Sequence, residues 1–190
     1  MKNAERLKNK MRPGRVYRRQ DLEKFSTAVD RDLKSLVEDG EVKKLAGGLY
    51  SRPRKNAFGF APPIEKDLVR AFLKTDDFLL TSYNYFTGLG LGLTQLYNRP
   101  VVYNHKRSGD FTLGGKRFEF RMVPAYPRKL DKEFVLVDML NNLKRLPDDT
   151  ALVLQNLKSR LNDFDQQKVR KYLNRYGRPA ARTTFDQTHA

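Results

Sequence analysis

The sequence has no cysteine and only two histidines, His105 and His189. The absence of cysteine excludes disulfide bonds and thiolate metal ligands, and two histidines are too few for a histidine-rich metal site. No apolar run approaches the ~20 residues that a membrane-spanning helix needs. The N-terminal stretch "MKNAERLKNKMRPGR" is basic and lacks the apolar segment of a secretory signal. We therefore predict a cytoplasmic protein that uses no cofactor or metal ion and does not bind membranes.

Acidic residues are few compared with basic ones. The chain has 38 Lys and Arg against 22 Asp and Glu, a formal net charge of +16, and its 39% apolar residues suffice for a core. A basic excess of this size indicates an anionic partner, with nucleic acid ahead of a membrane surface. Residues 1–60 carry +8, the same excess as residues 61–190 in less than half the length. The first sixty residues are therefore the expected nucleic-acid-binding part.

The first 25 residues predict two short helices separated by a strand. Ala4, Leu7 and Met11 recur at helical spacing, and "RPG" ends that helix. The segment "RVY" is a possible short strand. "RRQDLEKF" then predicts a second helix with Leu22 and Phe25 facing inward.

A third helix is predicted between Ser26, a candidate N-cap, and Gly40, which suits the left-handed conformation after a helix. Its apolar positions share one face at helical period, namely Val29, Leu33, Leu36 and Val37. The opposite face carries Thr27, Arg31, Lys34 and Glu38.

The stretch "EVKKLAGGLYSRP", residues 41–53, predicts a β-hairpin. "EVKKL" and "LYSR" are its strands, and Gly47-Gly48 form the turn, where glycine adopts a positive φ without steric cost. Three helices followed by a two-stranded wing make a winged helix-turn-helix. Two alternatives are a helical subdomain with a solvated basic face and a winged helix that binds protein. DNA binding is favoured because the apolar period of the helices, the order of the elements, the glycines of the turn and the basic charge all agree with it.

The predicted DNA contacts lie on the third helix and around the wing. Arg31 is the candidate for reading a guanine, because its guanidinium can bond O6 and N7 together. Its neighbours Asp30 and Asp32 argue against this assignment, since they would repel phosphate if they faced the backbone. The expected groove-facing residues are Thr27, Arg31, Lys34 and Ser35. The expected phosphate contacts are Arg18, Arg19, Lys43, Lys44 and Arg52.

After the wing, "KNAFGFAPP" is expected to be a linker with two exposed aromatic residues. Pro62-Pro63 then opens a helix whose inward residues are expected to be Ile64, Leu68, Ala71 and Phe72. Further on, Gly88, Gly90 and Gly92 have the spacing of a dinucleotide-binding loop, which requires a preceding strand. The preceding segment is expected to be helical from Ser82, so the glycines are interpreted as the end of a buried helix.

The remainder predicts a small antiparallel sheet and three helices. The strands are "RPVVYNHK", "DFTLGG" and "KRFEFRMVP". The helices are "EFVLVDMLNNLKRL", "PDDTALVLQNLKSRL" and "DFDQQKVRKYLNRYG". The fold class is therefore α+β: an N-terminal winged helix-turn-helix (residues 1–56), a mixed domain with a small antiparallel sheet and several helices (57–178), and a flexible tail (179–190).

Catalysis is not predicted, and no residue is assigned a catalytic role. Glu119, Asp131 and Asp138 could meet near the sheet and bind Mg²⁺, but the paired Asp-x-Asp of a nucleotidyltransferase strand is absent. An RNA-binding module that uses the same basic face is the first alternative to DNA binding, and a metal-dependent nucleic-acid enzyme is the second. Comparing duplex with hairpin binding tests the first alternative. A Mg²⁺-dependent cleavage or transfer assay tests the second.

Two stretches resemble a known family, the AbiEi-type antitoxins of abortive-infection, type IV toxin–antitoxin systems and related transcriptional regulators. One is the wing ending in "LAGGLYSRP". The other is "LTSYNYFTGLGLGLTQLYNRPVVY", which contains Gly92-Leu93-Thr94; this chain has Leu91 where the family usually has a histidine. The resemblance spans about residues 10–125. It implies a bacterial regulator that represses its own operon by binding the operator, and a nucleotidyltransferase-like toxin that it counters without forming a stable complex.

Overall fold

The computed structural model describes residues 3–57 and 59–189 and confirms a mixed α+β fold. The chain divides into two compact units. Unit 1 contains the described residues up to Asp77 together with Gly109–Phe118, and unit 2 contains Phe78–Ser108 and the described residues from Glu119 onward. Unit 1 therefore extends beyond the first domain expected at residues 1–56. None of the helices described is long and apolar enough to cross a membrane.

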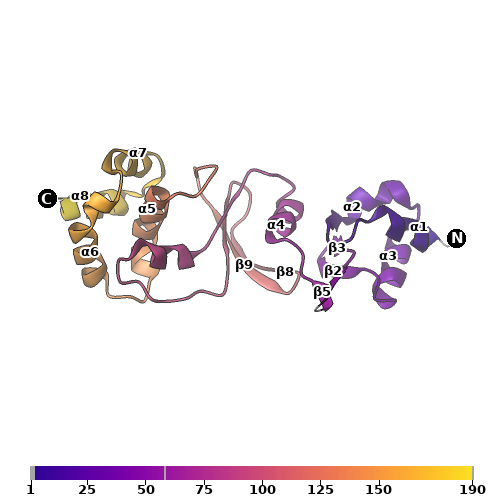
Figure 1. Cartoon of the computed structure of the whole chain (residues 1–190). Coiled ribbons are helices and arrows are strands. Elements are labelled where there is room, and N and C mark those ends of the chain that lie inside the picture. The colour runs from indigo at the N-terminus through magenta and orange to yellow at the C-terminus, as the bar shows by residue number, and fades with distance from the viewer. Residues whose placement is uncertain (1–2, 58, 190) are drawn as a thin grey trace. The chain divides into compact units, whose positions relative to one another are not determined.

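Unit 1 begins with helices around a small sheet (Figure 1). The helical segments are α1 (Asn3–Lys10), α2 (Arg19–Leu22), the 3-10 turn η1 (Glu23–Phe25) and α3 (Val29–Glu38). The strands are β1 (Val16–Arg18), β2 (Lys43–Ala46) and β3 (Leu49–Ser51), in the antiparallel order β1-β3-β2. Their core contains Leu7, Met11, Leu22, Val29, Leu33, Leu36 and Val42. The amphipathic periods of α1 and α3 therefore predicted the buried faces correctly.

Two local predictions in this region are wrong. Phe25 was expected to face inward but is 38% exposed. The α-helix ends at Leu22, and Phe25 lies in the 3-10 turn η1, where it does not face the core. Ser26 is not the N-cap of α3, because Ala28 occupies that position. The Ser26 hydroxyl instead accepts a hydrogen bond from the Ala28 N–H and donates one to the buried carboxylate of Asp32.

Residues 54–61 form a second hairpin where a linker was expected. Its strands are β4 (Arg54–Asn56) and β5 (Gly59–Ala61), in antiparallel register. Phe60 is exposed, as expected, whereas Phe58 lies outside the described residues. The helix α4 (Glu65–Leu73) follows and packs against β1. Ile64 was expected to face inward but is 64% exposed, because it precedes the helix as its N-cap residue.

A four-stranded sheet has the order β6-β7-β9-β8. Its strands are β6 (Leu79–Thr81), β7 (Val101–Asn104), β8 (Gly109–Leu113) and β9 (Lys116–Met122). The expected antiparallel sheet is wrong, since β7 pairs with β9 in parallel, although β6 and β7 are antiparallel. The second strand of the β8–β9 hairpin pairs with β7, and this strand runs in the same direction as β7.

The segment between β6 and β7 was expected to be helical from Ser82. It is the 3-10 helix η2 (Tyr83–Leu89), and the preceding strand β6 was not predicted. Gly90 ends η2 with φ +68°, a conformation that favours glycine. The Arg160 guanidinium lies over Gly90 and donates a hydrogen bond to its carbonyl, so a side chain at this position would also clash.

Unit 2 is built around α5 (Lys132–Asn142), whose residues from Phe134 to Leu140 are all buried. The 3-10 turn η3 (Leu143–Arg145) continues it. The surrounding helical segments are α6 (Thr150–Ser159), η4 (Leu161–Asp163), α7 (Gln166–Tyr176) and α8 (Pro179–His189). α5 contacts α7, α8 and η2 (Figure 1). Asp149 and Asp165 cap α6 and α7 by accepting hydrogen bonds from backbone N–H groups of the first turns.

The flexible tail expected at residues 179–190 is instead the helix α8, as far as His189. Ala181 and Phe185 on α8 are buried in the core of unit 2. Burial of these two side chains favours an ordered helix, which a polar terminal sequence alone does not indicate.

Candidate nucleic-acid interface

The exposed face of α3 carries two accessible cations. The Arg31 and Lys34 side chains are 76% and 77% exposed. Their nearest carboxylates, Asp32 and Glu38, are each 3.9 Å away, at the limit of an ion pair. Contacts of this kind in solvent hold a side chain only weakly. Arg31 and Lys34 are therefore free to contact an external anion, and Thr27 is exposed beside them.

The two aspartates next to Arg31 are both engaged with other side chains. Asp32 is buried and accepts a hydrogen bond of 2.5 Å from the Ser26 hydroxyl. Asp30 is bonded through both carboxylate oxygens to Arg19, at 2.5 Å each. Neither aspartate therefore presents an unpaired charge on the outer face of α3, which removes the main objection to Arg31 as a base-reading residue.

Three of the predicted phosphate contacts have partners within unit 1. Arg19 bridges Asp30 and Glu23. Arg52 is half-buried, and its Nη1 lies 3.3 Å from the carbonyl oxygens of Lys8 and Met11, where it satisfies free carbonyls at the end of α1. These contacts assign both arginines a role in holding the elements of unit 1 together.

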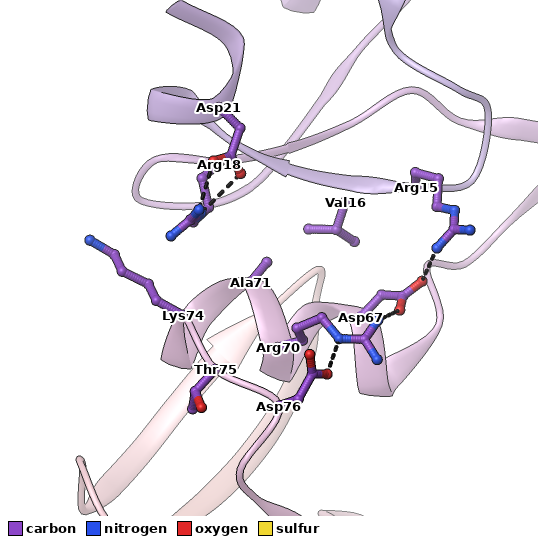
Figure 2. Close-up of a pocket in the computed structure, with 10 residues that line it drawn as sticks. All are labelled: Arg15, Val16, Arg18, Asp21, Asp67, Arg70, Ala71, Lys74, Thr75 and Asp76. Carbon is purple, nitrogen blue, oxygen red and sulfur yellow. Dashed lines mark hydrogen bonds and ion pairs between the residues drawn. The ribbon is translucent and has the colours of Figure 1, made fainter.

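Arg18 lies in a cavity of about 340 Å³ between β1 and α4 (Figure 2). Its guanidinium makes a two-point contact with Asp21, at 2.9 and 2.6 Å. Lys74 reaches into the same cavity from the end of α4. Asp67 and Arg70 also line it and pair with each other at 2.8 Å. Arg18 is thus the third predicted phosphate contact that is engaged inside unit 1.

The hairpin β2–β3 presents the two lysines predicted to contact phosphate. Lys43 and Lys44 are both exposed on β2. Gly48 in the turn has φ +70°, and Gly47 beside it has no positive φ. The predicted glycine-dependent geometry of the turn is therefore present at Gly48 but not at Gly47.

The second hairpin extends this basic surface. The Lys43 ammonium lies 5.0 Å from the centre of the Phe60 ring, and the Lys55 ammonium lies 5.8 Å from the same ring. Phe60 is 51% exposed. Lys55 was not among the predicted phosphate contacts, because these residues were expected to form a linker. The period-two pattern of "RKNAFGFA", with an aromatic opposite a lysine, was the available signal.

The carboxylates considered for Mg²⁺ do not form a site. Asp131 caps α5 by accepting a hydrogen bond from the Phe134 N–H, and Asp138 lies two turns further along the same helix. The carboxylate of Glu119 is instead paired with Arg99, Arg121 and Arg145. Residues 3–57 and 59–189 contain no group of three or more His, Asp or Glu placed to hold a metal ion.

No protein-family model matches the chain, and no curated protein or solved structure matches it. The functional proposal therefore rests on the geometry and charge of the residues described above.

Proposed function

We propose that the chain is a sequence-specific DNA-binding transcriptional regulator, and that unit 1 acts as a winged helix-turn-helix. The observation that carries this proposal is the pairing of two exposed basic features in one unit. One is the outer face of α3, with Arg31 and Lys34, and the other is the hairpin β2–β3, with Lys43 and Lys44. An α-helix fits the major groove of B-DNA, and lysines beside it bind the phosphate backbone.

In this arrangement each residue has a distinct role. Arg31 reads a base edge, because a guanidinium fork can bond O6 and N7 of one guanine. Lys34, Lys43, Lys44 and Lys55 contact phosphates and supply affinity that does not depend on sequence. Arg18, Arg19 and Arg52 support the fold of unit 1, because their guanidiniums are bonded to Asp21, Asp30 and the end of α1.

The wing and the Gly92-Leu93-Thr94 region resemble AbiEi-type antitoxins. This resemblance suggests the cellular role of the chain. The chain would repress its own operon from the cytoplasm and counter a nucleotidyltransferase-like toxin without binding it stably. The net charge of +16 fits an operator-binding protein, because its affinity for DNA has a large electrostatic component.

A gel-shift experiment tests the proposal with DNA from upstream of the protein's own gene. We expect a complex that survives a large excess of random duplex DNA and is not competed by an RNA hairpin of the same length. Equal binding to operator and random duplex would remove the regulatory role. Preference for the RNA hairpin would favour the RNA-binding alternative.

A further inference from the structure

Unit 2 contains a cavity of about 340 Å³ where α5, the corner between α7 and α8, and the end of β9 meet. This volume lies within the range of about 300–1,000 Å³ that is typical of small-molecule sites. The parallel strands β7 and β9 both end beside it, with Asn104 opposite Met122. Ligands of open α/β sheets bind at the carboxyl ends of parallel strands. No predicted DNA contact lines the cavity, so DNA binding does not account for it.

The floor of the cavity offers a hydrogen-bond acceptor. Asp138 is buried, and its Oδ1 accepts hydrogen bonds from the Tyr103 hydroxyl at 2.5 Å and from the Asn142 side-chain amide at 3.0 Å. Its other oxygen, Oδ2, has no donor among the described residues. Burial raises the pKa of Asp138 to about 6, so the carboxylate is ionised at neutral pH. An ionised buried carboxylate is stabilised by further N–H or O–H donors.

The same cavity is lined by two arginines that bind no carboxylate. Arg175 and Arg178 line it from the α7–α8 corner, and neither has an ion-pair partner within the described chain. Arg178 lies close enough to Asp138 to lower the pKa of that carboxyl group. Helix α8 starts at the next residue, Pro179, and a helix N-terminus carries partial positive charge. This side of the cavity is therefore suited to an anionic group.

Specific contacts hold the α7–α8 corner in place. Asn141 on α5 donates to the Tyr176 carbonyl at 3.0 Å and accepts from the Arg178 N–H at 2.7 Å. Gly177 passes so close to α7 that a Cβ there would lie 2.5 Å from the Leu173 carbonyl oxygen. Arg182 donates to the Leu173 and Asn174 carbonyls and so caps α7. A corner fixed in this way lowers the entropy cost of binding a ligand.

The rest of the cavity lining is largely apolar or aromatic. It includes Tyr176, Phe134, Val123 and Pro124. A ligand that matches the cavity therefore has a flat apolar body, a donor group that reaches Asp138 and an anionic group that reaches the arginines. A mononucleotide combines these features, because an aromatic base can carry an amino group and is joined to a phosphate. A free amino acid carries its amino and carboxylate groups on the same carbon, so a flat body cannot lie between them.

We propose that this cavity binds a nucleoside monophosphate, with the amino group of its base on Asp138 and its phosphate on Arg175 and Arg178. The assignment predicts a preference among ligands. CMP carries an amino group where UMP carries a carbonyl oxygen, which the Asp138 carboxylate would repel. CMP, GMP and AMP should therefore bind, and UMP should bind about tenfold more weakly or worse. This inference does not depend on DNA binding by unit 1.

Isothermal titration calorimetry and thermal melting of the full-length protein test the proposal with CMP, UMP, cytidine and inorganic phosphate. We expect CMP to bind measurably and to raise Tm. The double variant Arg175→Ala with Arg178→Ala should lower the affinity for CMP at least about tenfold. Lys158→Ala with Lys171→Ala removes the same charge from exposed positions on α6 and α7 outside the cavity and should leave CMP binding unchanged. Lys43→Ala with Lys44→Ala should also leave it unchanged.

Several outcomes would overturn the proposal. They are no binding of any nucleotide at millimolar concentration, equal binding of CMP and UMP, and equal binding of CMP and inorganic phosphate. Loss of CMP binding in the Lys43 and Lys44 variant would place the nucleotide on unit 1. Asp138→Asn, which keeps the acceptor for Tyr103 and presents an amide donor to the base, should reverse the preference toward UMP. An unchanged preference in a folded Asp138→Asn protein would exclude Asp138 as the base contact.

Discussion

Arg19 and Asp30 form a two-point ion pair that joins α2 to α3, with Nε–Oδ1 and Nη2–Oδ2 both at 2.5 Å. Arg19 also bonds Glu23 on the turn that follows α2. The hydrogen bonds from Arg19 hold the pKa of Asp30 below its ordinary range, so the pair stays ionised on both sides. Asp30 precedes Arg31, and the pair therefore neutralises a carboxylate at the edge of the proposed DNA-binding face.

This pair gives a test of how Arg19 acts. Arg19→Ala leaves Asp30 unpaired next to Arg31, and we expect DNA affinity to fall several-fold for operator and random duplex alike. Adding Asp30→Ala should restore binding, because the uncompensated carboxylate is gone. Fluorescence anisotropy with labelled duplex measures both variants. If the double variant binds as weakly as Arg19→Ala, Arg19 contacts phosphate directly, as the sequence alone suggested.

Arg31 is expected to control specificity. Arg31→Ala should weaken binding to the operator by about 1–3 kcal/mol and leave random DNA nearly unchanged, because a bidentate guanine contact discriminates between bases. Competition gel shifts with the two duplexes measure the ratio. An equal loss on both would make Arg31 a phosphate contact and would require a different rotation of α3 in the groove.

The salt dependence of binding reports the number of phosphate contacts. Four lysines, namely Lys34, Lys43, Lys44 and Lys55, would give a slope of log K against log salt of about −3 to −4, at about −0.9 per contact. Lys43→Ala with Lys44→Ala should reduce the slope by about 2 and weaken all sequences alike. Duplex affinity that is insensitive to salt would contradict an electrostatic interface on unit 1.

The two wing glycines should respond differently to substitution. Gly48 has φ +70°, where a β-branched side chain is strained, whereas Gly47 has no positive φ, and no atom lies within 4 Å of a Cβ placed on either residue. Gly48→Val should therefore distort the hairpin and weaken DNA binding, while the helical core keeps a near-native melting transition.

Gly47→Val is the matched control and should bind DNA normally, because Gly47 has no positive φ. Circular dichroism and thermal melting on the same samples separate a local change from unfolding. Full DNA affinity in Gly48→Val would mean that the hairpin does not contact DNA, and Lys43 and Lys44 would then be solvated surface residues.

The buried carboxyl of Asp138 should make the stability of unit 2 depend on pH. Its pKa is raised by burial from 3.8 to about 6, partly offset by hydrogen bonds from Tyr103 and Asn142 and by the charges of Arg121 and Arg178. The folded state therefore binds a proton more tightly than the unfolded chain. This contribution to stability is present below pH 4 and is lost as pH rises through about 6.

The Asp138→Asn variant isolates this effect, because an amide keeps the acceptor for Tyr103 without the charge. Relative to the native chain, the variant should gain about 2 kcal/mol of unfolding free energy between pH 4 and pH 7. Denaturant unfolding at the two pH values measures the gain. A difference between the two proteins that does not change with pH would show that Asp138 is charged at both values or at neither.

The local pattern of the sequence determined most of the helices. The apolar period of α3 is enough to bury Leu33 and Leu36 and to leave Arg31 and Lys34 in solvent, because a helix fixes which residues share a face. Asp149 and Asp165 cap α6 and α7 through short-range hydrogen bonds, so the starts of these helices depend on local sequence. The excess of basic residues likewise follows from composition alone.

Tertiary structure decided the strand pairing, the long-range side-chain contacts and the cavity, because no short-range pattern in the sequence specifies them. β9, the second strand of the β8–β9 hairpin, pairs with β7 in parallel. Strand pairing of this kind depends on residues distant in sequence. The engagement of Arg19 with Asp30 and of Arg52 with the end of α1 is equally non-local. The cavity around Asp138 brings α5 against residues after α7, about forty positions later, so only packing could place its carboxylate near Arg178.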